Sequence, residues 1–114
     1  MTLNAHVRLT ICDDSHDLPG AFGGGCVSLL EGVAKEGSLN RAAKRMGMAY
    51  SKAWRIVREA EAHLGCKLLA RDGARGSSLT VEAQKVISLY HEMQDKIEAL
   101  VTEEMRSWGT PGVL

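Results

Sequence analysis

The sequence has little of what marks several specialised classes of protein. No stretch approaches the roughly 20 consecutive apolar residues of a membrane-spanning helix, and the first residues lack the basic start and apolar core of a signal peptide. Aromatic residues make up 4 % of the 114 residues, and the formal net charge is zero. With 45 % hydrophobic and 25 % charged residues, the composition predicts one globular domain, which we expect in the cytoplasm and without a membrane partner.

Cysteines and histidines are few and scattered. Cys12, Cys26 and Cys66 include no C-x-x-C pair, and the four histidines are equally dispersed. Three cysteines at such irregular spacing do not fit the pattern of a disulfide framework or of a zinc site. We therefore expect three small, buried thiols in a reducing compartment, no metal site and no cofactor.

The glycine-rich segment 20–25 does not match a nucleotide-binding loop. Gly25 is followed by Cys-Val-Ser, whereas a phosphate-binding loop continues with Gly-Lys and a hydroxyl residue. No complete βαβ unit surrounds the glycines, as a dinucleotide site requires. We expect a short strand over residues 5–12, followed by a flexible lead-in to a helix. No nucleophile–base pair or carboxylate cluster has a recognisable spacing, so an enzyme is not expected.

The zero net charge conceals an asymmetric distribution. Residues 35–75 contain ten basic and four acidic side chains, an excess of six positive charges that the rest of the chain balances. Such a segment is either an ordinary solvated surface or a patch for a polyanion, because clustered Lys and Arg attract phosphates. The surrounding pattern must decide between the two.

The apolar spacing predicts three helices, over residues 26–36, 38–46 and 50–64, each followed at once by a glycine. Small residues such as Ala42 and Ala53 would let the second and third helices cross closely. Two short helices joined by a glycine-containing turn are typical of a helix-turn-helix. The alternative is a helical hairpin inside an unrelated core.

A basic hairpin is predicted directly after the third helix. Segments 66–70 and 79–81 are strand candidates, and the loop between them carries Arg71 and Arg75 among Gly and Ser residues. In this position the hairpin is typical of the wing of a winged helix, whose tip reaches a minor groove or nearby phosphates. The alternative is a solvated turn. The winged helix-turn-helix would span residues 26–81, after an N-terminal strand and loop over 1–25.

A long last helix and a tail complete the prediction over residues 82–114. Thr80 is a candidate N-cap, and a helix to about Trp108 would be roughly 42 Å long, more than so small a body covers. Its apolar stripe is spaced like a coiled-coil seam, which predicts a homodimer; the alternative is a helix that packs back on its own domain. The expected interface residues are Val86, Tyr90, Met93, Ile97, Leu100 and Val101.

Several motifs resemble one known family. The sequence contains GSLNRAAKRMGMAYSKAW, then LGCKLLAR, then the Leu-Thr that opens the last helix. These motifs resemble the N-terminal DNA-binding domain of ModE, the molybdate-responsive regulator, and are more distantly similar to the helix-turn-helix of LysR-type regulators. The resemblance covers about residues 20–100. Ala49 stands where the ModE pattern has Ser, so one hydroxyl that would cap the third helix is absent. No molybdate-binding domain follows, so we do not expect this chain to bind molybdate.

The resemblance implies a dimer that inserts helix 50–64 of each subunit into successive major grooves of double-stranded DNA. The exposed first turns of that helix, the start of the second helix and the wing would supply the contacts. The expected DNA-binding residues are Ser38, Asn40, Arg41, Tyr50, Ser51, Lys52, Arg55, Arg71 and Arg75.

The sequence therefore predicts a mainly α (α+β) winged helix-turn-helix that regulates transcription by binding a two-fold symmetric site as a homodimer. Trp54, at the edge of the third helix, is expected to pack in the core more than to contact bases. Two other functions stay open: a protein-interaction module without DNA binding, and an added role in sensing a metal or small molecule.

Overall fold

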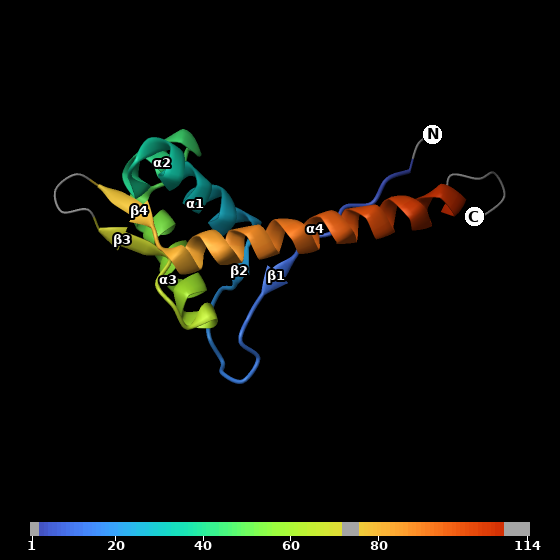
Figure 1. Ribbon diagram of the computed structural model, residues 1–114, viewed down its shortest axis with the longest axis horizontal. Coiled ribbons are helices and arrows are strands. Elements are labelled where there is room, and N and C mark those ends of the chain that lie inside the picture. Colours follow the sequence, from blue (N-terminus) through green and yellow to red (C-terminus); the bar gives the residue numbers. More distant parts are fainter. Residues whose placement is uncertain (1–2, 72–75, 109–114) are drawn as a thin grey trace.

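The computed structural model describes residues 3–71 and 76–108, which form a mainly helical domain with two small two-stranded sheets (Figure 1). This confirms the predicted fold class. None of the helices in these ranges is long and apolar enough to cross a membrane. In chain order the elements are β1 (Thr10–Ile11), β2 (Phe22–Gly23), α1 (Gly24–Glu36), α2 (Leu39–Arg45), α3 (Tyr50–Leu64), β3 (Leu69–Arg71), β4 (Ser77–Leu79) and α4 (Val81–Trp108).

Glycine and serine caps set the boundaries of the first three helices. Gly37 ends α1 with φ 83°, a left-handed conformation that favours glycine, and its N–H donates to Val33 O at 2.8 Å. Ser38 then begins α2, since its hydroxyl oxygen accepts a hydrogen bond from the Arg41 N–H at 3.1 Å. Gly65 ends α3 in the same way as Gly37, with φ 70°. The predicted bounds of α3 are confirmed.

The core lies where α1 crosses the helix-turn-helix. Its largest fully buried side chains include Phe22, Leu29 and Leu39. Small residues also let α1 and α2 pack closely, because a Cβ added at Gly32 of α1 would lie 2.9 Å from the Ala42 Cβ of α2. This contact is between α1 and α2, whereas the sequence predicted a close crossing of α2 and α3.

The hairpin after α3 is present, but both strands lie nearer its tip than predicted. Strand β3 begins at Leu69 rather than residue 66, because residues 65–68 turn the chain: the Leu68 N–H donates to Glu61 Oε2 of α3 at 2.8 Å. Strand β4 ends at Leu79, because Thr80 leaves the sheet to cap α4. The two strands pair antiparallel, with Leu69 opposite Leu79.

The predicted strand over residues 5–12 is too long, since β1 contains two residues. Its partner is β2, which the glycine-rich segment supplies, with Ile11 opposite Phe22. The loop between them is tied to α3: the Asp13 N–H donates to His63 Nδ1 at 2.9 Å, and His63 Nε2 lies 3.0 Å from Pro19 O. Phe22, which is fully buried, was not among the residues that periodicity indicated as core.

Helix α4 begins against the body and continues well beyond it (Figure 1). The molecule is correspondingly elongated, with extents of 61 × 33 × 23 Å. The N-terminal segment runs beside the far half of α4, and Gln94 donates to Val7 O at 3.4 Å. Part of the helix that we expected to be bare is therefore covered by the chain itself.

Candidate nucleic-acid interface

Helix α3 presents a polar, basic face to solvent. Ala53 and Val57 are fully buried on its inner side, whereas Ser51, Lys52 and Arg55 are exposed on the other side. This division follows from the helical repeat, because residues three and four apart share a face. The cationic side of the helix therefore projects outward, as the sequence prediction requires.

Four of the predicted contact residues carry positive charges that no acidic residue among the described residues neutralises. Arg41, Lys52, Arg55 and Arg71 are exposed, and none forms an ion pair with a residue in ranges 3–71 and 76–108. Arg45, by contrast, lies 3.0 Å from Glu36. Unpaired guanidinium and ammonium groups on one surface favour binding of an anion such as a phosphate chain.

The start of α2, the start of α3 and the wing meet around one small pocket. It has a volume of about 230 Å³, and Asn40, Tyr50 and Arg71 are among the residues that line it. Ser38 also lines it, with its hydroxyl engaged at the α2 cap. The fold thus brings together four predicted site residues from three separate segments. Lys52 and Arg55 do not line this pocket; they lie on the outer face of α3.

An aromatic stripe on α3 borders this pocket and extends away from it. The rings of Tyr50 and Trp54 meet edge to face with centroids 6.2 Å apart, and the Arg58 guanidinium lies 5.6 Å from the Trp54 ring. Trp54 is half-buried and packs against the core, as expected. The sequence analysis did not predict this contact of Arg58, although its spacing of four from Trp54 was a usable signal.

The first turn of α3 lacks a side-chain cap, as the alanine in the sequence indicated. Ala49 occupies the N-cap with extended backbone and offers no hydroxyl to the first N–H groups of the helix. These N–H groups carry the positive end of the helix dipole. They therefore add to the positive potential beside Tyr50.

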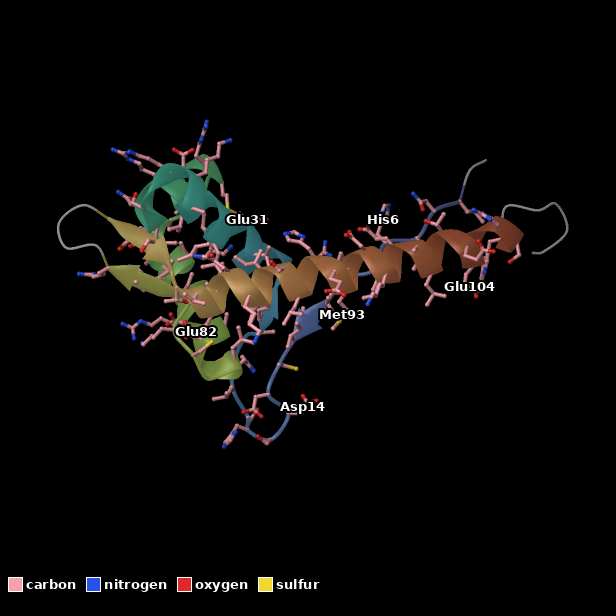
Figure 2. All side chains as sticks on the ribbon, in the orientation of Figure 1. His6, Asp14, Glu31, Glu82, Met93 and Glu104 are labelled. Carbon is pink, nitrogen blue, oxygen red and sulfur yellow. The ribbon has the colours of Figure 1, made fainter. Side chains whose placement is uncertain are left out.

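The remaining predicted residues fall into four groups. Arg75 lies outside the described residues. Tyr90 lies in the core of the protomer: its hydroxyl donates to Leu9 O at 3.0 Å, and its ring meets Phe22 edge to face at 5.7 Å. Met93 and Leu100 are exposed on α4 (Figure 2, Met93). The other three predicted interface residues are half-buried: Val86, Ile97 and Val101.

Outside this surface, the described residues show no cluster that could hold a metal ion. No three side chains of His, Cys, Asp or Glu in ranges 3–71 and 76–108 are grouped for that purpose. Figure 2 shows Asp14 on the loop between β1 and β2, well away from Glu82 at the start of α4.

The helix pair α2–α3, the capped helix α1 and the hairpin β3–β4 together define a winged helix-turn-helix domain. The model of one protein family, "Bacterial regulatory helix-turn-helix protein, lysR family", matches residues 27–84. Because this match covers half of the chain, the protein belongs to the lysR family of bacterial regulatory helix-turn-helix proteins.

Solved structures agree with this fold. The DNA-binding domain of CbnR, solved in a complex with DNA, is similar with a TM-score of 0.59 and 23 % identity over 75 % of this chain and 97 % of that chain. The DNA-binding domain of BenM, solved with catB site 1 DNA, gives a TM-score of 0.57 and 22 % identity over 77 % of this chain and 96 % of that chain. A comparison with curated proteins gave no match.

Proposed function

We propose that this chain is a sequence-specific DNA-binding transcriptional regulator that places α3 in the major groove. The observation that carries the proposal is the exposed face of α3 formed by Lys52 and Arg55, neither of which has an ion pair among the described residues. Lys and Arg at the start of such a helix suit the acceptor atoms of guanine. The proposal includes no catalytic step and no cofactor.

The surroundings of α3 support a defined position on the duplex. The uncapped start of α3, and Ser38 and Asn40 at the start of α2, would hold phosphates on either side of the groove. The two DNA-binding domains with the same fold were themselves solved in complexes with DNA. We propose in addition that the helix-turn-helix is ModE-like within the lysR family, a proposal supported by the resemblance of the motif GSLNRAAKRMGMAYSKAW to ModE.

We further propose that the regulator binds as a homodimer through α4. Leu89, Met93 and Leu100 are 52 %, 46 % and 62 % exposed on this helix, at spacings of four and seven residues. Such spacing places them on one side of a helix, where a second copy would cover them. A two-fold symmetric protein would bind a two-fold symmetric site.

The test is a selection of bound sequences from a pool of random DNA duplexes. Wild type is expected to enrich a two-fold symmetric sequence, whereas Lys52→Ala and Arg55→Ala should each lose about 1–3 kcal/mol of preference for it, the usual worth of a base contact. Lys67→Ala is the control, because Lys67 is also exposed but lies beyond the other end of α3, where its Nζ is 3.9 Å from Glu61 Oε1. Thermal midpoints of all variants should match wild type.

Two results would contradict the proposal. If Lys52→Ala and Arg55→Ala enriched the same sequence with unchanged affinity, α3 would not be the recognition helix. If wild type enriched no sequence and bound duplex DNA with no dependence on salt, the protein would be an interaction module of another kind. A dimer that neutralises about ten phosphates should show log affinity falling with log salt at a slope near −9.

A further inference from the structure

The base of the wing makes a close backbone contact with the turn between α1 and α2. The Ser77 N–H donates to Gly37 O at 3.0 Å, although the two residues are 40 positions apart. Gly76 lies directly against the same carbonyl: a Cβ built on Gly76 would be 2.3 Å from Gly37 O, far inside any real contact. The wing can therefore reach this position because residue 76 has no side chain.

This contact joins the parts that form the pocket described above. Gly37 ends α1 and is followed by Ser38, which caps α2, while Ser77 is paired across the hairpin with Arg71. The bond from Ser77 to Gly37 thus fixes the spacing between the wing strand that carries Arg71 and the start of α2. All of these residues except Gly37 line the same 230 Å³ pocket.

We propose that Gly76 is a positioning residue. The hydrogen bond from the Ser77 N–H to Gly37 O, with Gly76 against the same carbonyl, forms a backbone clamp between the wing and the start of α2. This clamp holds Arg71 at the distance from α2 at which Arg71 and α2 contact one DNA backbone. The inference rests on the proposed function and deepens it. A side chain at position 76 would push the wing away from α2 and leave α3 in place, because α3 is held by its own buried face, Ala53, Val57 and Ala60.

A glycine variant outside the clamp is the control for a left-handed alanine. Gly65 has φ 70°, and a Cβ at this position would meet no atom within 4 Å, so Gly65→Ala tests the cost of a left-handed alanine alone. Gly76 has φ 124°, so Gly76→Ala adds further backbone strain at the base of the wing and the collision with Gly37 O. Of the two variants, only Gly76→Ala should release the Ser77 N–H.

The first measurement is hydrogen exchange at the Ser77 amide, which does not depend on DNA. In wild type this amide should be protected, and in Gly76→Ala it should exchange at least about tenfold faster, while amides of α3 keep their protection. Gly65→Ala should leave the Ser77 amide as in wild type. An unprotected Ser77 amide in wild type, or equal exchange at Ser77 in Gly76→Ala and Gly65→Ala, would overturn the clamp.

The second measurement is binding to a labelled pool of random-sequence duplexes at low salt. Gly76→Ala should bind about tenfold more weakly than Gly65→Ala, and the salt slope should shrink by about 1 per protomer, as for a lost phosphate contact. In the Arg71→Ala background the Gly76→Ala change should have little further effect, because both remove the same contact.

The positioning role would be overturned if the losses of DNA affinity caused by Arg71→Ala and Gly76→Ala were additive in the double variant. It would also be overturned if Gly76→Ala released the Ser77 amide but kept full affinity for DNA. If wild type bound no duplex at all, the proposed function would fall and the DNA half of this inference with it. Exchange at Ser77 would still decide whether the clamp exists.

Discussion

Cys12 and Cys26 are chemically identical side chains that the fold makes different. Cys26 is 2 % exposed in α1, and burial, together with the charge of Glu61, raises the pKa of its thiol to about 12. The expectation of three buried thiols is wrong for Cys12, which is exposed in the loop after β1, where the hydrogen bond from its thiol to Asp14 raises its pKa. A thiolate is the reactive form, so both burial and pKa protect Cys26.

Brief labelling of the native protein with N-ethylmaleimide at about pH 8 should therefore modify Cys12 and leave Cys26 untouched. The reaction at Cys12 should be slower than that of a free cysteine, because the raised pKa lowers its thiolate fraction. Mass spectrometry of peptides gives both rates, and the same reaction in denaturant is the control, in which Cys26 should react fully. Equal native rates at the two sites would contradict this placement of α1.

At the scale of helices and strands, the sequence predicts those bounds that depend on the local pattern of residues. Helix α3 has its predicted bounds because Gly65 supplies a left-handed cap and the apolar residues recur at helical spacing. The wing strands were displaced by two or three residues because their bounds depend on bonds between distant residues: Glu61 to the Leu68 N–H and Thr80 to Lys67. No periodicity within the hairpin reveals these bonds.

The same dependence on local pattern explains which residues of the candidate site could be predicted from the sequence. The residues Ser51, Lys52 and Arg55 are exposed on α3, as their spacing indicated. Gly76 gave no signal, because a glycine in a hairpin loop is ordinary, and its importance comes from a carbonyl 39 residues earlier in the chain. Likewise, Tyr90 is not part of the exposed stripe of α4, because it packs against Phe22 and donates a hydrogen bond to Leu9 O. Only the tertiary structure brings these residues together.

Thr80 joins the wing to the start of α4 with one hydroxyl group. Its Oγ1 donates to Lys67 O at 2.7 Å and accepts from the Ala83 N–H at 3.0 Å, so it serves as the N-cap of α4 and as a fastening of the hairpin. Thr80→Ala should lower the free energy of unfolding by about 1–2 kcal/mol, the usual cost of a lost cap with a further bond. Urea denaturation measures this change.

Thr80→Ser is the matched control, because it keeps the hydroxyl and removes a methyl group from a partly exposed position. It should cost less than about 0.5 kcal/mol. If Thr80→Ala and Thr80→Ser had the same free energy of unfolding, the two hydrogen bonds of the Thr80 hydroxyl would contribute nothing measurable to stability. The wing and the start of α4 would then be held together by packing alone.

At the scale of the whole molecule, charge is separated along the long axis. The helix-turn-helix end carries the positive excess, whereas residues 91–108 of α4 contain five acidic and two basic side chains. Glu104 lies near the far end of this helix in Figure 2. An acidic rod is repelled by phosphates, so this distribution favours an orientation in which the body faces DNA and α4 points away.

The rod also has two different sides. One is lined by the N-terminal segment, which with Gln94, Ile97 and Val101 borders a pocket of about 320 Å³. The other carries the exposed apolar stripe Leu89, Met93 and Leu100. Because the first side is already partnered by the chain itself, the stripe is the surface that we expect a second copy to cover.

Leu100→Glu should consequently turn the protein into a monomer. A dimer interface would have to bury the new carboxylate without a partner and would lose a leucine side chain worth about 1.5–3 kcal/mol, so the dissociation constant should rise about a hundredfold or more.

Val81→Glu is the control. Val81 is 77 % exposed on the same helix, but it is the first residue of α4, next to the body, where a carboxylate suits the helix dipole. Sedimentation at micromolar concentration should give a dimer for wild type and Val81→Glu and a monomer for Leu100→Glu, with unchanged helix content by circular dichroism. A wild-type monomer that stays unpaired on duplex DNA would contradict the interface, as would a Leu100→Glu dimer as tight as wild type.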